Sequence, residues 1–116
     1  MTIDKNLIDE LMYNTIVTLN EKGYTTKYCC QGHPEKDYIY IYIKFEYLHM
    51  HEVIKSIKNV RLPRGFEFFS IDTVSFFVEG GTYETYEERK EIIIKKNKAL
   101  ERWAKRLPPI TITDNK

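Results

Sequence analysis

The chain has 116 residues, of which 42% are hydrophobic and 30% are charged, and a chain of this size builds one hydrophobic core. We therefore expect a single domain over residues 1–116, with no room for a separate cofactor domain. Lys and Arg number 18 against 17 Asp and Glu, so any attraction to polyanions has to come from a local patch and not from the whole surface. This balance argues against a dedicated nucleic-acid coat protein.

The N-terminal residues lack the basic start and apolar run of a signal peptide, and no stretch approaches the roughly 18 apolar residues of a membrane span. We expect a cytoplasmic protein without a membrane partner. In a reducing compartment Cys29 and Cys30 are expected to be thiols. A bridge between them would also need a strained turn, because neighbouring residues on a strand point to opposite faces.

The first half of the chain predicts one helix and one pair of strands. Apolar residues at helical spacing from Ile3 to Leu19 predict an amphipathic helix over residues 4–22, which ends at Gly23. Period-two patterns then predict strands over residues 24–30 and 38–45. The turn-rich segment between them predicts an antiparallel pair joined by a loop of about seven residues.

The second of these strands has two different faces. One face carries only apolar residues and is expected to be core, and the other carries three tyrosines and a lysine. Helices could cover these tyrosines and bury the sheet on both sides, but because a tyrosine hydroxyl favours water, three in a row favour a half-exposed groove or an oligomer interface. The core face consists of Ile39, Ile41, Ile43 and Phe45, and the tyrosine face consists of Tyr38, Tyr40, Tyr42 and Lys44.

The second half completes an α+β pattern. Residues 47–58 predict a short helix, and two aromatic-rich strands that reverse near residues 71–73 follow a turn at residues 63–65. A capping-box sequence at 85–88 opens a long helix, and Pro108 and Pro109 end it before a tail that either adds an edge strand or stays loose. The buried stripe of that helix is expected to be Ile93, Leu100, Trp103 and Leu107. The order α-β-β-α-β-β-α predicts a four-stranded, mainly antiparallel sheet with helices packed on one face.

The segment CCQGH, residues 29–33, leaves several interpretations open. Zinc would be held by Cys29 or Cys30 with His33, but a closed site needs four ligands and strand alternation separates the cysteines. We therefore expect neither a metal nor another cofactor. Nucleophilic catalysis would use a cysteine thiolate with His33 close enough to lower the pKa of the thiol, but no third orienting group is identifiable. A purely structural role, with a buried cysteine and a Gly-His-Pro turn, is a further alternative.

A ligand-binding turn is the remaining interpretation. Gly32 lets the backbone approach a ligand, consecutive amides can form an anion nest, and the His33 imidazole can donate a hydrogen bond to a phosphate or carboxylate. Tyrosines of the sheet could stack on a base, with arginine adding positive charge. The expected ligand-binding residues are Tyr28, Cys30, Gln31, Gly32, His33, Tyr40, Tyr42 and Arg64.

Several of these segments resemble a known family. LNEKGYTTKYCCQGH, YIYIKF, LPRGF and ALERWAKRLP resemble a family of short, largely uncharacterised proteins of low-GC Gram-positive bacteria and their phages, whose core reads Cys-Cys-Ser-Gly-His. Gln31 stands here at the serine position. More distantly, YTTKYCCQGH is similar to the Thr-x-x-Ser-Cys-Ser-Gly-Arg signature of the tRNA methyltransferases of wybutosine synthesis. In that alignment Cys30, Gly32 and His33 match the Cys, Gly and Arg of the signature, with histidine in place of arginine.

These resemblances imply a strand-turn-strand site on a protein about half as long as those enzymes. We expect a protein that binds a small, anionic, nucleotide-like ligand without converting it. A phage could use such a protein to sequester a nucleotide signal of host defence. The alternative is a small RNA-modifying or thiol-dependent enzyme that uses the CCQGH turn. RNA is a possible partner, and the tyrosine face could join copies of the chain into a homo-oligomer.

Overall fold

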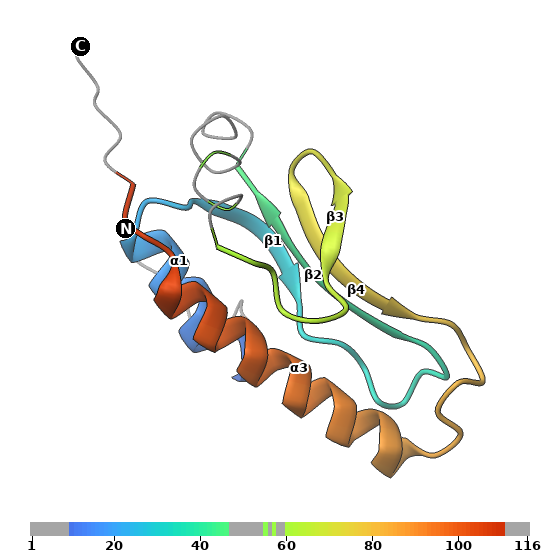
Figure 1. The fold of residues 1–116 in the computed structure, drawn as a ribbon. Coiled ribbons are helices and arrows are strands. Elements are labelled where there is room, and N and C mark those ends of the chain that lie inside the picture. Colours follow the sequence, from blue (N-terminus) through green and yellow to red (C-terminus); the bar gives the residue numbers. More distant parts are fainter. Residues whose placement is uncertain (1–9, 47–54, 56, 58–59, 111–116) are drawn as a thin grey trace.

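A computed structural model describes residues 10–46, 55, 57 and 60–110, and these residues form an α+β fold (Figure 1). A four-stranded antiparallel sheet lies against helices on one face, so the predicted fold class is confirmed. The elements are the 3-10 helix η2 (Glu10–Met12), α1 (Tyr13–Glu21), β1 (Thr26–Cys30), β2 (Ile39–Phe45), β3 (Glu67–Ser70), β4 (Thr73–Val78) and α3 (Tyr86–Arg106). The predicted helix over residues 47–58 falls largely outside the described residues, as does the tail from residue 111.

The strand order is β1-β2-β4-β3. The central strand β2 alternates between fully buried and half-buried residues along its whole length, as its period-two sequence predicts. The buried side consists of Ile39, Ile41, Ile43 and Phe45, each with no exposed surface. The two faces of β2 therefore have different roles, since only one of them belongs to the core.

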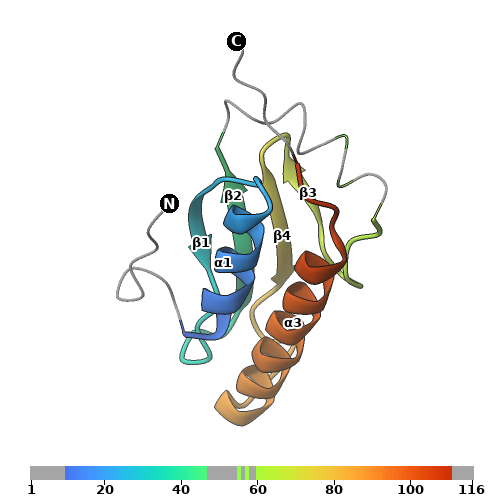
Figure 2. The same cartoon turned by 90° about the vertical axis from the view of Figure 1, so that its left-hand side faces the viewer.

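Both α1 and α3 lie on the core side of the sheet, side by side (Figures 1 and 2). Along α3 the buried residues recur at helical spacing and face the apolar side of β2. Trp103, the one tryptophan of the chain, is completely buried in this core together with Leu100. The buried stripe of α3 comprises Ile93, Asn97, Leu100, Trp103 and Ala104, with Leu107 just beyond the helix. All four predicted stripe residues are confirmed.

The helix α1 ends in a Schellman motif. Gly23 has φ +97°, its amide donates to the Asn20 carbonyl (3.1 Å), and the Tyr24 amide donates to the Leu19 carbonyl (2.9 Å). Tyr24 is buried directly after this turn, so the chain enters the core before β1 begins. The predicted stop at Gly23 is confirmed.

The end of α1 is also tied to the end of α3. The Lys22 ammonium group donates to the carbonyls of Ala104 (2.9 Å), Lys105 (2.6 Å) and Leu107 (2.7 Å). A cation at this position adds hydrogen bonds to carbonyls at the end of α3 and offsets the negative end of its dipole. The Ile110 amide then donates to the Lys22 carbonyl (2.6 Å), which fixes the segment after α3.

At its other end α3 begins with the predicted capping box. The Glu88 amide donates to the Thr85 hydroxyl (3.1 Å), and the Thr85 amide donates to the Glu88 carboxylate (3.1 Å). The chain turns ahead of it at Gly80 and Gly81. None of the helices that the structure describes combines the length and the apolar character that a bilayer crossing demands.

Candidate functional site

The sheet face opposite the helices carries a hollow lined by aromatic rings. We call it the aromatic hollow; it has a volume of about 480 Å³ and is lined by Tyr38, Tyr40, Glu67, Phe69, Ser75 and Phe77. Phe69 and Phe77 are 71% and 59% exposed, which is unusual for side chains of this size. None of the described helices covers this face, so the predicted half-exposed tyrosine face has a physical counterpart.

The rings of the aromatic hollow contact one another through the register of β2 and β4. Tyr40 lies opposite Phe77, and their ring centroids are 6.1 Å apart at an angle of 75°. The ring centroids of Tyr38 and Phe77 are 6.4 Å apart. Tyr42 extends the row, because its ring centroid lies 5.0 Å from that of Tyr40. Spacings of this order are favourable for aromatic pairs and hold the rings in a defined arrangement.

The two cysteines point to opposite faces of the sheet. Cys29 pairs with Ile43, a core residue, and packs against the core. Cys30 pairs with Tyr42, so it lies on the same face as the aromatic hollow. Neither cysteine forms a disulfide bond. The strand alternation that argued against a shared metal ion is therefore present in the structure.

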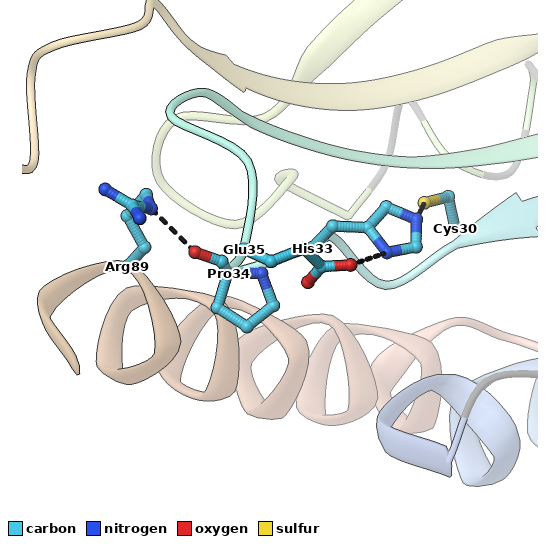
Figure 3. A network of polar contacts seen from close by, with 5 residues as sticks. All are labelled: Cys30, His33, Pro34, Glu35 and Arg89. Atoms are coloured by element: carbon cyan, nitrogen blue, oxygen red, sulfur yellow. Dashed lines mark hydrogen bonds and ion pairs between the residues drawn. The ribbon is translucent and has the colours of Figure 1, made fainter. Parts of the chain in front are cut away.

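Cys30, His33 and Glu35 form a continuous chain of polar contacts (Figure 3). The Cys30 sulfur lies 3.5 Å from His33 Nε2, and His33 Nδ1 lies 3.5 Å from the Glu35 carboxylate. About half of the His33 and Glu35 side chains is exposed, at 53% and 61%. No sequence pattern singled out Glu35, because a carboxylate two residues after a histidine is not a characteristic spacing.

Long-range hydrogen bonds fix the loop that carries His33. Arg89 of α3 donates from Nε to the Pro34 carbonyl (2.8 Å) and from a terminal nitrogen to the Tyr83 carbonyl (2.9 Å). The Asn97 side chain donates to the Gln31 carbonyl (3.0 Å). Both donors come from α3, so this helix determines where the CCQGH turn sits relative to the sheet.

Gln31 and Gly32 have structural roles in this turn. The Gln31 side-chain oxygen accepts a hydrogen bond from the Leu11 amide (2.7 Å), which fixes the position of η2 relative to the turn. Gly32 is buried with φ +103°, and a Cβ there would lie 3.1 Å from Ile93 and 3.2 Å from Ile41. The close approach predicted for Gly32 is thus an approach to the core of the protein itself.

A second groove, of about 340 Å³, lies beside His33 on the helix side of the loop. Its charged lining residues are Glu10, His33, Glu35 and Lys90. Because its lining includes two carboxylates and one lysine, this groove is a poor site for a free anion.

The remaining predicted ligand-binding residues occupy two different surfaces. Tyr28 is 59% exposed. It lies on the edge strand β1, where it pairs with Lys44 of β2. Arg64 does not join the aromatic hollow. It lines a separate groove against α3 with Lys95, Lys96, Arg102 and Arg106, and its carbonyl accepts a hydrogen bond from Lys96 (2.8 Å).

Sequence reasoning did not single out the aromatic side chains that complete the hollow. Phe77 and Phe69 belong to strands whose apolar residues do not alternate with polar ones, so their facing was ambiguous until pairing was known. Only the register, in which Phe77 lies opposite Tyr40, assigns it to the open face. A signal was nevertheless present in the sequence, because two consecutive Phe residues on a strand cannot both face the core. In β4 Phe76 is buried and Phe77 exposed, and in β3 both Phe68 and Phe69 are exposed.

Among the described residues no group of three or more His, Cys, Asp or Glu side chains is arranged to hold a metal ion. The absence of a structural metal stays a prediction for the whole chain.

Comparison of the chain with protein-family models, with curated proteins and with solved structures gives no match. The class of protein is therefore defined by its own architecture, an α+β sandwich with an open, aromatic sheet face.

Proposed function

We propose that the protein binds a nucleotide-like ligand without converting it, with the base of the ligand in the aromatic hollow. The observation that carries the proposal is the ring set of Tyr38, Tyr40, Phe69 and Phe77 around one open depression of about 480 Å³. Stacking on exposed aromatic side chains of an antiparallel sheet is a common way for proteins to bind bases. The low hydrogen-bonding capacity of these rings favours broad base recognition.

The anionic part of the ligand is proposed to lie toward His33. A row of side chains connects the two places, because Tyr42 neighbours Tyr40 on one side and pairs with Cys30 on the other. Cys30 in turn contacts His33. Two residues along β2 span roughly 7 Å and neighbouring strands lie about 5 Å apart, so the row from Tyr40 through Tyr42 to Cys30 is comparable in length with a nucleotide and its phosphates. The resemblance to phage proteins suggests a nucleotide signal of host defence as the ligand.

Calorimetry with mononucleotides, cyclic nucleotides and ADP-ribose derivatives tests this proposal. Tyr40→Ala should weaken binding by about 1–3 kcal/mol, the usual contribution of one stacked base. Ile71→Ala, which removes an exposed apolar side chain at the turn between β3 and β4, is the matched control and should leave affinity unchanged. If no member of the panel binds, or if both variants bind as the parent does, the proposal is wrong.

The His33 contribution is tested separately. If the imidazole donates a charge-assisted hydrogen bond, His33→Ala should weaken binding by about 1.5–3 kcal/mol with little change in melting temperature. Cys30→Ser should retain binding. A His33→Ala variant that loses stability as severely as affinity would show that the imidazole is part of the fold.

The aromatic hollow could instead join two copies of the chain. In that case the exposed rings would be buried between protomers, and Tyr40→Ala would shift the protein to monomers. Size-exclusion chromatography with light scattering over a range of protein concentrations distinguishes the cases. A concentration-dependent dimer lost in Tyr40→Ala would contradict nucleotide binding at this face.

One observation favours a second candidate function, thiol-dependent catalysis. In the contact chain Cys30–His33–Glu35 the imidazole lies between a thiol and a carboxylate (Figure 3). In this arrangement His33 Nε2 would take the Cys30 proton while Glu35 orients the ring through Nδ1. The thiolate would then displace a leaving group from an electrophilic carbon of the substrate, and the protonated imidazole of His33 would return the proton to that leaving group.

Alkylation with iodoacetamide measures that reactivity. Cys30 should react faster than Cys29, which faces the core, and His33→Ala should move the rise of the rate to higher pH. Glu35→Gln should have a smaller effect in the same direction. Equal rates for the parent and His33→Ala would show that the contact does not activate the thiol and would remove the enzymatic alternative.

A further inference from the structure

A strongly basic groove lies on the helix layer, away from the aromatic hollow. We call it the basic groove; it has a volume of about 370 Å³ and lies between α3 and the turn at residues 63–65. Five cationic side chains line it, and its described lining includes no carboxylate. These five are Arg64, Lys95, Lys96, Arg102 and Arg106. In a chain with a net charge of only +1 this is a marked local concentration of positive charge.

Helical spacing produces the row of cations along α3. Lys95, Arg102 and Arg106 are separated by intervals of seven and four residues, which place them on one side of the helix. Ala99 lies between them and provides a small side chain at the floor of the groove. With a rise of 1.5 Å per residue, the row extends over about 16 Å.

The turn that supplies Arg64 is held rigidly against this row. The Phe66 amide donates to the Pro63 carbonyl (3.0 Å), and Gly65 has φ +89°. A Cβ at Gly65 would lie 2.8 Å from the Phe76 ring, so the turn sits directly on β4. Lys96 joins turn and helix, because its ammonium group donates to the Arg64 carbonyl and lies 4.9 Å from the centre of the Phe76 ring.

Among the described residues, none of the five cations of the groove takes part in an ion pair with a carboxylate. Glu101, which precedes Arg102 on α3, pairs with Lys105 instead (3.0 Å). Burial, followed by repulsion from Lys95 and Arg64, lowers the pKa of Lys96 below its usual value. Like charges held together in this way are stabilised when an anion binds between them.

We propose that the basic groove binds the phosphodiester backbone of a nucleic acid strand. Cations spread over about 16 Å exceed the reach of a single phosphate but match several successive phosphates of one strand. A membrane surface is a poorer fit, because the helix side of the groove offers Ala99 and no large apolar side chain to enter a bilayer. The groove is independent of the aromatic hollow, since the two lie on opposite layers.

Fluorescence anisotropy with a labelled oligothymidylate, measured over a series of salt concentrations, tests the proposal. The double variant Arg102→Gln/Arg106→Gln should lower affinity about tenfold or more and reduce the slope of log K against log salt by about 0.7 for each lost contact. The matched control is Lys98→Gln/Lys105→Gln, which removes the same charge from the same helix outside the groove. The control should change affinity by less than about twofold.

Three outcomes would overturn the proposal. The first is the absence of salt-dependent binding, and the second is an equal loss in both double variants, which would mean diffuse attraction to α3. The third is preferential binding of phosphatidylserine vesicles or of inorganic triphosphate over the oligonucleotide. Tyr40→Ala distinguishes this groove from the proposed nucleotide site, because it should leave the salt slope unchanged whether or not bases stack in the aromatic hollow.

Discussion

Gly32 and Gly81 are two glycines with similar backbone angles in different surroundings. Their φ values are +103° and +89°, but a Cβ at Gly32 would press on Ile41 and Ile93, whereas a Cβ at Gly81 meets no atom within 4 Å. Gly81→Ala therefore carries only backbone strain, about 1 kcal/mol. Gly32→Ala adds overpacking and should destabilise by about 1–3 kcal/mol more. Urea denaturation of both variants measures the difference, and equal losses would mean that the core yields around residue 32.

Asp72 gives the β3–β4 turn a defined pH dependence. Its carboxylate accepts hydrogen bonds from Ser70 (2.8 Å) and Thr73 (3.0 Å) and pairs with Lys44 (3.2 Å). The hydrogen bond from Ser70, followed by the Lys44 contact, lowers the pKa of Asp72 below its usual value, although burial acts in the opposite direction. The lowered pKa stabilises the fold above the unfolded-state pKa of about 3.9, and this stabilisation is lost as the pH falls through the lower folded-state value.

Asp72→Asn should consequently be less stable than the parent near neutral pH, with the difference shrinking below about pH 4. Urea denaturation over a pH series gives the comparison. Glu79→Gln, which removes an exposed carboxylate, is the control. Its free energy of unfolding should change with pH in the same way as that of the parent. A constant gap between Asp72→Asn and the parent at all pH values would show that the loss arises from packing.

At the scale of elements, the alternation of β2 makes the clearest contrast. Ile41 is fully buried and its neighbour Tyr40 lies on the open face. Ile41→Ala should destabilise the protein by about 2–5 kcal/mol, the usual range for a truncated core residue. Tyr40→Ala should cost less stability and act mainly on binding. Denaturant melts that show a similar loss for both would mean that the tyrosine face is packed in solution.

Lys22 connects the ends of α1 and α3. Since its ammonium group satisfies carbonyls at the end of α3, Lys22→Met should lower the free energy of unfolding by about 1–3 kcal/mol while keeping most of the aliphatic stem. Lys98→Met, an exposed lysine of α3, is the control and should be nearly neutral. Thermal melts monitored by circular dichroism compare the two. Equal effects would show that the three hydrogen bonds to Lys22 add no net stability.

These elements show what the sequence could and could not predict. Local signals were sufficient for the end of α1, the two faces of β2 and the capping box of α3, because each depends on residues only a few positions apart. Lys22 illustrates the limit. Its sequence position suggests a cation at the end of its own helix, whereas its partners lie more than 80 residues away.

At the scale of the whole molecule, the two candidate binding surfaces belong to different layers of the fold. The aromatic hollow lies on the open sheet face, and the basic groove lies with α3 on the other layer. From the sequence we predicted that Arg64 adds positive charge to the binding site of the tyrosines, because both belong to segments around the same sheet. Which layer the turn at residues 63–65 joins depends on its packing against Phe76 and Lys96, and no local pattern records that choice.

The burial of Trp103 gives the protein an internal optical reporter. With no other tryptophan in the chain, the emission excited at the red edge of the absorption band comes from one indole inside the core. The native spectrum should be blue-shifted, and separation of α3 from the sheet should move it toward the wavelength of a hydrated indole. A ligand stacked in the aromatic hollow should leave the position of this emission unchanged, since the sheet lies between them. One fluorescence experiment can thus tell the loss of the helix layer apart from events on the open face.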